Sequence, residues 1–392
     1  MTLSADEARH VSLPTPIDPV SFVLDDPAPL RLTFEHLSEA TVSDASKLMD
    51  PYRASPAIPG ARGELIFRKR EHPLPRLIEV QRPAGDGLIT SFDGSNYHLL
   101  EGNSALTLPT DPIEGDTYEV DQAFNIRRAW RRVVLPALQM AVSRAGGVAV
   151  HSSSVQIGGR GILIAGWSES GKTETALSLA EAGGLFLSDK WTILHEGSMY
   201  VFPISAGIRS WVLEYLPAFR NRLTTSTRIR LGVSGLLSRS VSGTNKAVAG
   251  TRLAPWASRF TPVVGLADRA SLSPSNLSRA LGRPHQSWSS HLDAFVVLTT
   301  VPGDQIQAEP CEPSWAAKKM ARSAAYERRA FFDLFERASF ASPRFSALPA
   351  GRVLEIEESR LKDVLGNVQT LQIRAPFPVD PRKVADAIQD CL

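Results

Sequence analysis

Cysteine is nearly absent from this chain, since only Cys311 and Cys391 occur among its 392 residues. Two cysteines so far apart do not form the dense disulfide framework of a small secreted protein, and neither has the neighbours of a zinc site. They indicate reduced thiols in a cytoplasmic protein, with a single disulfide between them as the alternative.

Long apolar runs and an excess of one charge are lacking too. No stretch of about 18 uncharged apolar residues is present, so we predict neither a membrane-spanning helix nor a membrane partner. Residues 1–20 are polar and lack the basic start and apolar core of a secretory signal, which predicts a flexible N-terminus. Lys and Arg number 43 against 41 for Asp and Glu, a balance that does not favour nucleic acid as a partner.

The chain has the length and composition of a protein with several domains, since 43% of its residues are hydrophobic. Residues 21–124 alternate short β-rich runs with Gly, Asp and Asn turn signals, which predicts a mostly β N-terminal domain. Apolar strand patterns then alternate with helical ones, and this predicts an α/β core over 125–310 that residues 311–392 complete.

Several elements of the core are predicted individually. Residues 125–144 have helical spacing, and Pro136 should kink or break that helix. Residues 191–203 resemble a hairpin that turns at Glu196–Ser198, and 315–338 form one amphipathic helix. Strands are predicted at 260–268 and 294–300, and residues 369–391 are expected to form a strand, a turn and a final helix.

The stretch "GWSESGKT" contains a phosphate-binding pattern. Gly166, Gly171, Lys172 and Thr173 satisfy G-x-x-x-x-G-K-[ST] between an apolar strand and an amphipathic helix. The glycines let backbone N–H groups point at phosphate oxygens, the lysine neutralises the outer phosphates, and the threonine hydroxyl binds Mg²⁺. An ordinary strand-to-helix turn is the alternative. The predicted nucleotide-binding residues are Gly166, Trp167, Ser168, Glu169, Ser170, Gly171, Lys172, Thr173 and Glu174.

Two acids in this segment have two interpretations each. Glu169 places a carboxylate inside the loop, where it either points to solvent or weakens nucleotide binding by facing the phosphates. Glu174 lies in the first helical turn, where it either complements the helix dipole or binds a water molecule of the metal ion.

Two further residues flank the loop in sequence. Asp189 ends the strand that follows the loop helix, and the C-terminal edge of such a sheet is where ligands bind. A carboxylate there binds Mg²⁺ or accepts a proton from an attacking hydroxyl, and the alternative is an Asp that caps a turn. His151 precedes the loop strand, and its residue type alone favours a structural role.

The segment from His151 to Leu194 resembles the catalytic segment of HPr kinase/phosphorylase and its serine-kinase-like relatives, which have the phosphoenolpyruvate-carboxykinase-like nucleotide fold. That family has a His, a short β-hairpin, a loop of the form GxSGxGKSE, an ETAL-type helix start and a strand ending in Asp-Asp. The chain departs from it twice, with Glu169 at the second loop glycine and Lys190 at the second aspartate. The matching positions are His151, Gly166, Ser168, Gly171, Lys172, Thr173, Glu174 and Asp189.

The resemblance implies a mixed-sheet P-loop kinase core and a role for each matching residue. Asp189 would be the base for the acceptor hydroxyl, assisted by His151, while Lys172 would hold the β- and γ-phosphates. Thr173, Glu174 and Asp189 would serve Mg²⁺. Lys190 removes one metal or proton-transfer carboxylate and would instead pair with substrate phosphate or with Glu174.

The stretch after this core is rich in arginine, which suits bidentate phosphate contacts. Arg209, Lys246, Arg252 and Arg259 are candidates, with Lys190, for a substrate or phosphate clamp. Scattered solvated charge is the alternative.

These observations predict a kinase that uses ATP and Mg²⁺ and phosphorylates an alcohol. The acceptor would be a serine of a protein or peptide, a free hydroxy amino acid or a small metabolite. A nucleotide-binding pseudokinase, acting as a regulatory or scaffold protein of a biosynthetic cluster, is the alternative. A transport or motor ATPase is less favoured, because no LSGGQ-like run is present. The sequence is compatible with an oligomer.

Overall fold

The computed structural model describes residues 18–24, 28–57, 63–82, 88–101, 104–122, 124–231, 269–284, 287–345 and 349–392. The fold is mixed α/β with mixed sheets and a β-rich N-terminal region, as predicted. The strand predicted at 260–268 lies outside the described residues. Within the described ranges, no helix is both long enough and apolar enough to cross a membrane.

The N-terminal region forms a nine-stranded sheet in the order β3-β1-β2-β4-β9-β8-β7-β6-β5. Its pairs are antiparallel except β2–β4 and β4–β9, which are parallel. Helix α1 (Glu39–Leu48), which the sequence patterns did not predict, links β2 to β3, and the Ser38 hydroxyl caps it by accepting from the Thr41 amide at 3.2 Å. The strands are β1 (Val20–Val23), β2 (Arg31–Glu35), β3 (Arg53–Pro56), β4 (Glu64–Lys69), β5 (Glu79–Gln81), β6 (Ile89–Phe92), β7 (Tyr97–Glu101), β8 (Ser104–Leu108) and β9 (Thr117–Val120).

The helical segment after this sheet is interrupted at the predicted place. It consists of α2 (Ile126–Ala129), a π-helical turn η1 (Trp130–Val134) and α3 (Leu135–Arg144). Pro136 lies in the first turn of α3, so the irregular turn directly precedes the proline that lacks an N–H to donate. The prediction of a break at this proline is confirmed.

These helices share one hydrophobic core with the sheets on both sides. Trp130, Val133 and Leu138 are buried in the same cluster as Phe67 of the N-terminal sheet and Ile193 of the next sheet. The N-terminal sheet therefore packs against one face of these helices and fixes their position.

The rest of the chain contains two larger sheets and a short ladder. A four-stranded antiparallel sheet has the order β10-β14-β15-β18, and a six-stranded mixed sheet has the order β13-β11-β12-β19-β21-β20, in which β12, β19 and β21 are parallel. The short ladder pairs β16 with β17. The strands of the two sheets and the ladder are β10 (Val148–Val150), β11 (Ser152–Ile157), β12 (Arg160–Gly166), β13 (Leu185–Ser188), β14 (Thr192–His195), β15 (Ser198–Val201), β16 (Ala206–Arg209), β17 (Arg269–Leu272), β18 (Ser289–His291), β19 (Ala294–Thr300), β20 (Gln307–Pro310) and β21 (Gln369–Ala375).

The hairpin β14–β15 confirms the predicted turn. Glu196 and Gly197 occupy it with φ of 48° and 73°, the left-handed pair of a two-residue hairpin turn. The predicted strand at 294–300 and the strand, turn and helix near the C-terminus are also present.

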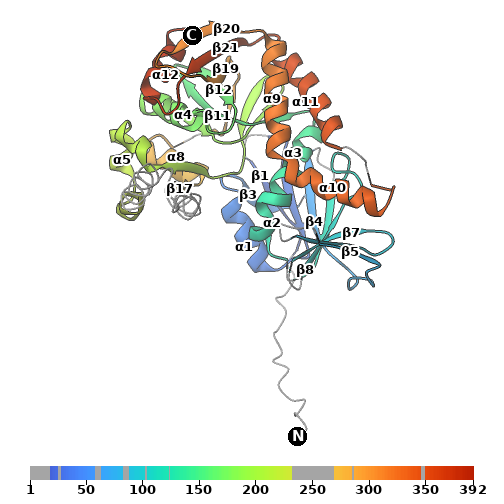
Figure 1. The fold of residues 1–392 in the computed structure, drawn as a ribbon. Helices are drawn as coiled ribbons and strands as arrows, with labels where there is room; N and C mark the ends of the chain where they lie inside the picture. The colour runs from blue at the N-terminus through green and yellow to red at the C-terminus, as the bar shows by residue number, and fades with distance from the viewer. Residues whose placement is uncertain are drawn as a thin grey trace, which may run out of the picture.

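Helices cover both faces of the six-stranded sheet (Figure 1). Ile162 and Ile164 of β12 point into the cluster with α4 (Lys172–Glu181) and α12 (Pro381–Gln389), while Leu163 points into the cluster with α9 (Pro313–Glu327) and α11 (Pro349–Leu365). This alternation explains the continuous apolar run of the loop strand. The other described helices are η2 (Ser210–Glu214), α5 (Pro217–Arg222), α8 (Pro274–Ala280) and α10 (Arg329–Ala341).

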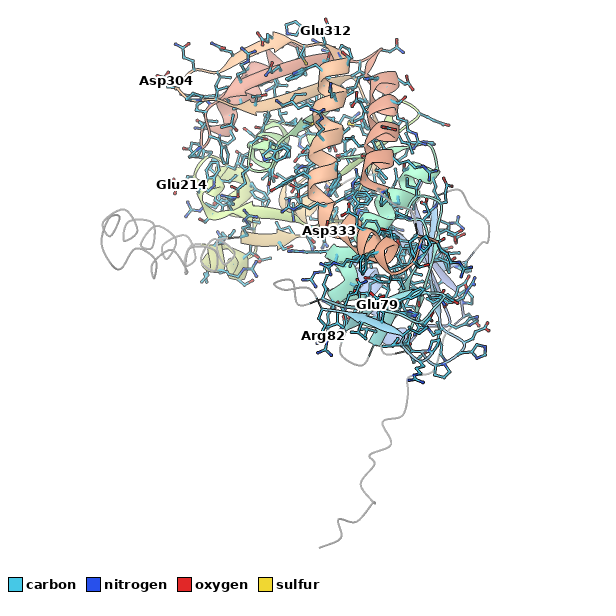
Figure 2. All side chains as sticks on the ribbon, turned by 45° about the vertical axis from the view of Figure 1, so that its right-hand side comes forward. Glu79, Arg82, Glu214, Asp304, Glu312 and Asp333 are labelled. Atoms are coloured by element: carbon cyan, nitrogen blue, oxygen red, sulfur yellow. The ribbon has the colours of Figure 1, made fainter. Side chains whose placement is uncertain are left out.

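The prediction of one helix over 315–338 is wrong, because α9 ends and α10 begins around Arg328. Figure 2 shows Glu312, where α9 begins, at one end of the molecule and Asp333 of α10 near the N-terminal sheet. Arg328 is 1% exposed and pairs with Glu357 of α11. Phe331, Phe332 and Phe335 of α10 join the core of the N-terminal sheet. Because α9 packs against the six-stranded sheet and α10 against the N-terminal sheet, the helix cannot continue straight through Arg328 as its sequence pattern predicts.

Candidate nucleotide site

Two crossings of the chain between sheets build the centre of the site. The chain leaves the four-stranded sheet at His151, between β10 and β11, and returns through Asp189 and Lys190, between β13 and β14. The Ser152 amide donates to the Lys190 carbonyl at 3.0 Å, so the crossings lie side by side. The continuous β-rich run "VAVHSSSVQI" is thus divided into β10 and β11 at the histidine.

The predicted phosphate loop joins β12 to α4. Gly171 caps α4 with φ of 91°, and a Cβ there would lie 3.4 Å from the Phe377 ring. A Cβ on Gly166 would lie 2.7 Å from the Leu298 carbonyl oxygen. Glycine is therefore required at both ends of the loop. The Ser170 hydroxyl is buried and has no hydrogen-bond partner among the described residues.

Lys172 is buried beneath this loop at 6% exposure. Its ammonium donates to the carbonyls of Gly166 at 3.1 Å and Trp167 at 2.6 Å. Burial lowers the pKa of Lys172 to about 8, against the attraction of Asp189, Glu327 and Glu174. Folding therefore removes the ammonium of Lys172 from water and holds it beneath the loop that is predicted to bind phosphates.

This burial predicts a pH-dependent cost to stability. The pKa of Lys172 is about 8 in the folded chain against 10.5 for an ordinary lysine, so between these values the unfolded chain binds more protons and stability from this residue rises with pH. Lys172→Met removes that dependence. Relative to the variant, the wild type should gain about 2–3 kcal/mol in free energy of unfolding from pH 7 to pH 10. Urea unfolding across this range measures it. Exposed Lys318→Met is the control, and a constant difference for Lys172→Met would contradict the buried charge.

Thr173 and Asp189 meet at the mouth of the loop. The hydroxyls of Thr173 and Ser153 donate to Asp189 Oδ1 at 2.7 Å and 2.5 Å. Asp189 is 3% exposed, and its Oδ2 has no hydrogen-bond partner among the described residues. A buried carboxylate oxygen in this state needs a cation or a donor from a ligand.

Oxygen donors of this kind fit Mg²⁺. Glu174 lies beside them, and burial raises the pKa of its carboxyl, with a further contribution from Asp189. No cluster of three or more His, Cys, Asp or Glu side chains suited to a metal occurs in the described part of the chain. Phosphate and water oxygens would therefore complete the coordination of Mg²⁺, which is its usual mode at nucleotides.

His151 is buried and neutral. Burial, followed by the charges of Lys172 and Lys190, lowers the pKa of its imidazole to about 3. Its Nδ1 lies 3.1 Å from the Ser323 hydroxyl, which donates in turn to the Gly166 carbonyl at 3.5 Å. This direction of donation assigns the ring proton to Nδ1 and leaves Nε2 as a hydrogen-bond acceptor.

Glu169 takes the solvent-facing alternative. It adopts φ of 61°, a left-handed conformation that suits the glycine of the related loops. Its exposed carboxylate forms ion pairs with Arg209 and, at 3.2 Å, with Arg269. The loop acid therefore pairs with two arginines at the rim of the site and offsets part of their charge.

The other predicted residues have different fates. Trp167 is 50% exposed and packs its ring 4.7 Å from Tyr326. Lys190 adopts φ of 61°, and burial lowers its pKa. Lys246, Arg252 and Arg259 lie outside the described residues.

A cavity of about 360 Å³ adjoins the loop. The structure brings most of the predicted residues together at this cavity, which is lined by His151, Ser168, Glu169, Ser170, Gly171, Lys172, Thr173, Glu174, Asp189, Lys190 and Arg209. It is also lined by residues that sequence reasoning missed, namely Arg131, Gln139, Arg269, Glu327 and Arg328. Those residues carry no motif, and only the fold places them beside the loop.

Comparison with models of known protein families gives no match to the chain. A search of curated proteins gives no significant match either.

Proposed function

We propose that this protein is a kinase with a P-loop core of the HPr-kinase type, which uses ATP and Mg²⁺ to phosphorylate an alcohol. The observation that carries the proposal is the state of Asp189, which lines the cavity. Its Oδ1 accepts a hydrogen bond from the hydroxyl of the loop threonine at 2.7 Å, and its buried Oδ2 has no hydrogen-bond partner among the described residues. We also place the protein in the cytoplasm, where two free thiols are stable.

The loop and its helix supply the phosphate-binding groups. Backbone amides at the start of α4 and the positive end of its dipole favour a polyphosphate. Lys172 exchanges the carbonyls of Gly166 and Trp167 for phosphate oxygens. Thr173, Asp189 and Glu174 would hold Mg²⁺, which neutralises charge on the phosphates.

The two chain crossings supply the acceptor side. Asp189 accepts the hydrogen bond of the acceptor's hydroxyl and so orients it for in-line attack, while Nε2 of His151 accepts a hydrogen bond from another donor of the acceptor. The new P–O bond forms as the bond to ADP breaks, and the hydroxyl proton passes to Asp189 late in the step. Most of the catalysis in such a site comes from positioning and charge neutralisation.

Calorimetric titration with MgATP and an assay of ADP formation, with and without added hydroxyl compounds, test the proposal. We expect MgATP to bind, Lys172→Met to abolish the binding, and ADP formation to depend on an acceptor. Failure of the wild type to bind MgATP would refute the assignment of the loop.

A nucleotide-binding regulatory protein without transfer activity is the second candidate. Lys190 favours it, because a cation with a lowered pKa stands at the position where the resembling family has its second aspartate. This candidate predicts that MgATP binds and stays intact with every acceptor offered.

A further inference from the structure

We propose that the acceptor is a small alcohol that also carries an anionic group, a carboxylate or a phosphate, which Arg131 and Lys190 hold on one wall of the cavity. The inference rests on the proposed function and names the class of its acceptor. It is based on a comparison of the cationic side chains that line the cavity, some of which have a carboxylate partner in the protein and some of which do not.

Three cations at the cavity already have a carboxylate partner within the protein. Arg209 and Arg269 share the carboxylate of Glu169, and Arg328 makes a bidentate pair with Glu357. Arg328 is therefore neutralised, whereas one positive charge remains between Arg209 and Arg269 at the rim of the site.

Arg131 and Lys190 differ from them. Both line the cavity, and within the described ranges neither side chain has a hydrogen-bond or ion-pair partner. Two like charges that repel each other across a cavity are stabilised by an anion placed between them.

These cations are separate from the predicted phosphate cradle. The cradle consists of the loop, the start of α4 and Lys172, whereas Arg131 comes from η1 and Lys190 from the β13–β14 crossing next to Asp189. An anion held by both would therefore lie on the side of the acceptor, within reach of the residue that orients the hydroxyl.

Acceptors of hydrogen bonds on the same wall indicate what else the molecule carries. Gln139 of α3 is 2% exposed, and its amide oxygen has no partner in the part of the chain that the structure describes. The carboxylate-bearing Glu327 also lines the cavity. A second hydroxyl or an ammonium group on the acceptor would satisfy these oxygens.

The size of the cavity argues for a compact acceptor. Ligand pockets usually measure about 300–1,000 Å³, and about 360 Å³ here must hold both the phosphates and the acceptor. Leu135, Pro136 and Trp191 close the walls around the charged groups. A free hydroxy acid or phosphate monoester fits this space better than the surface of a folded protein.

An acceptor panel with matched variants tests the proposal. The panel contains L-serine and D-glycerate as hydroxy acids, glycerol 3-phosphate as a phosphate monoester, glycerol as a neutral alcohol, and a serine peptide with both ends blocked. Arg131→Gln removes one cation of the pair. Arg128→Gln is the control, since Arg128 is exposed one turn earlier and does not line the cavity.

We expect only the anionic alcohols to be phosphorylated efficiently. Arg131→Gln should raise their KM about ten- to a hundredfold, as expected for the loss of a charge-assisted hydrogen bond, and leave the Kd of MgATP unchanged. Arg128→Gln should change neither constant. The carboxylate and phosphate arms show which anionic group the wall prefers.

The outcomes separate this proposal from the proposed function. Absence of MgATP binding would refute the function itself. Equal use of glycerol or of the blocked peptide, with no effect of Arg131→Gln, would overturn only the anionic acceptor. If no compound is phosphorylated, the same probes are titrated into protein loaded with a non-hydrolysable ATP analogue and Mg²⁺. Binding of an anionic probe that Arg131→Gln weakens supports the proposal, and absence of binding at millimolar concentrations overturns it.

Discussion

Asp189→Asn is expected to retain MgATP binding and to lower phosphoryl transfer by about 10²–10⁴-fold. The asparagine oxygen still accepts hydrogen bonds from Thr173 and Ser153, so the loop and the strand end keep their geometry. The variant loses the negative charge that faces the cavity, and with it the group that accepts the proton. Calorimetry for the Kd of MgATP and steady-state assays for kcat measure the two effects separately.

Asp304→Asn is the matched control for this variant, because Asp304 is exposed on the loop between β19 and β20 (Figure 2). It should behave as the wild type in both assays. Transfer that survives in Asp189→Asn would remove the carboxylate from the mechanism, and lost transfer together with lost folding would show a structural role instead.

The second large effect concerns the pair of Arg328 and Glu357. Their side chains are 1% and 0% exposed, and Nη1 of the arginine donates to Oε1 of the glutamate at 2.7 Å. The arginine also lies 5.7 Å from the ring centroid of Trp191, so the pair joins the α9–α10 junction and α11 to the edge of the cavity. Glu357→Gln leaves a buried guanidinium without its counter-charge and should lower the free energy of unfolding by about 3–5 kcal/mol.

Urea denaturation of three variants tests this effect. Glu358→Gln on the same helix breaks only the exposed pair with Lys362 and should change stability little. The double variant Arg328→Met with Glu357→Leu should recover much of the loss, because it leaves no charge buried. A small effect of Glu357→Gln alone would show that water reaches the pair.

Local features of this fold could be predicted because their causes are local. The turn at Glu196 and Gly197, the break before Pro136 and the order of strand, loop and helix at Gly171 each depend on a few adjacent residues. A glycine in a turn, a proline without an N–H and an apolar run have the same effect on the local backbone in most proteins, so their consequences can be predicted from sequence. The pairing of these elements into three larger sheets involves residues far apart in sequence and was not predicted.

The missed parts of the site have tertiary causes. Arg131 and Gln139 lie in a helical pattern that predicts only one buried face, and their position at the cavity follows from the packing of η1 and α3. Arg328 occurs in the middle of a continuous amphipathic pattern, and only its partner on α11 explains why it is buried and why the helix ends there. Helix α1 was missed because its ten residues contain few large apolar side chains.

The packing of η1 and α3 against the N-terminal sheet links the proposed acceptor wall to a distant part of the chain. Arg131 lies on the helical segment whose buried residues share one core with Phe67 and its neighbours. Under the proposed function, we expect substitutions in that core to shift Arg131 and so to change the choice of acceptor, while the loop and its nucleotide contacts stay in place.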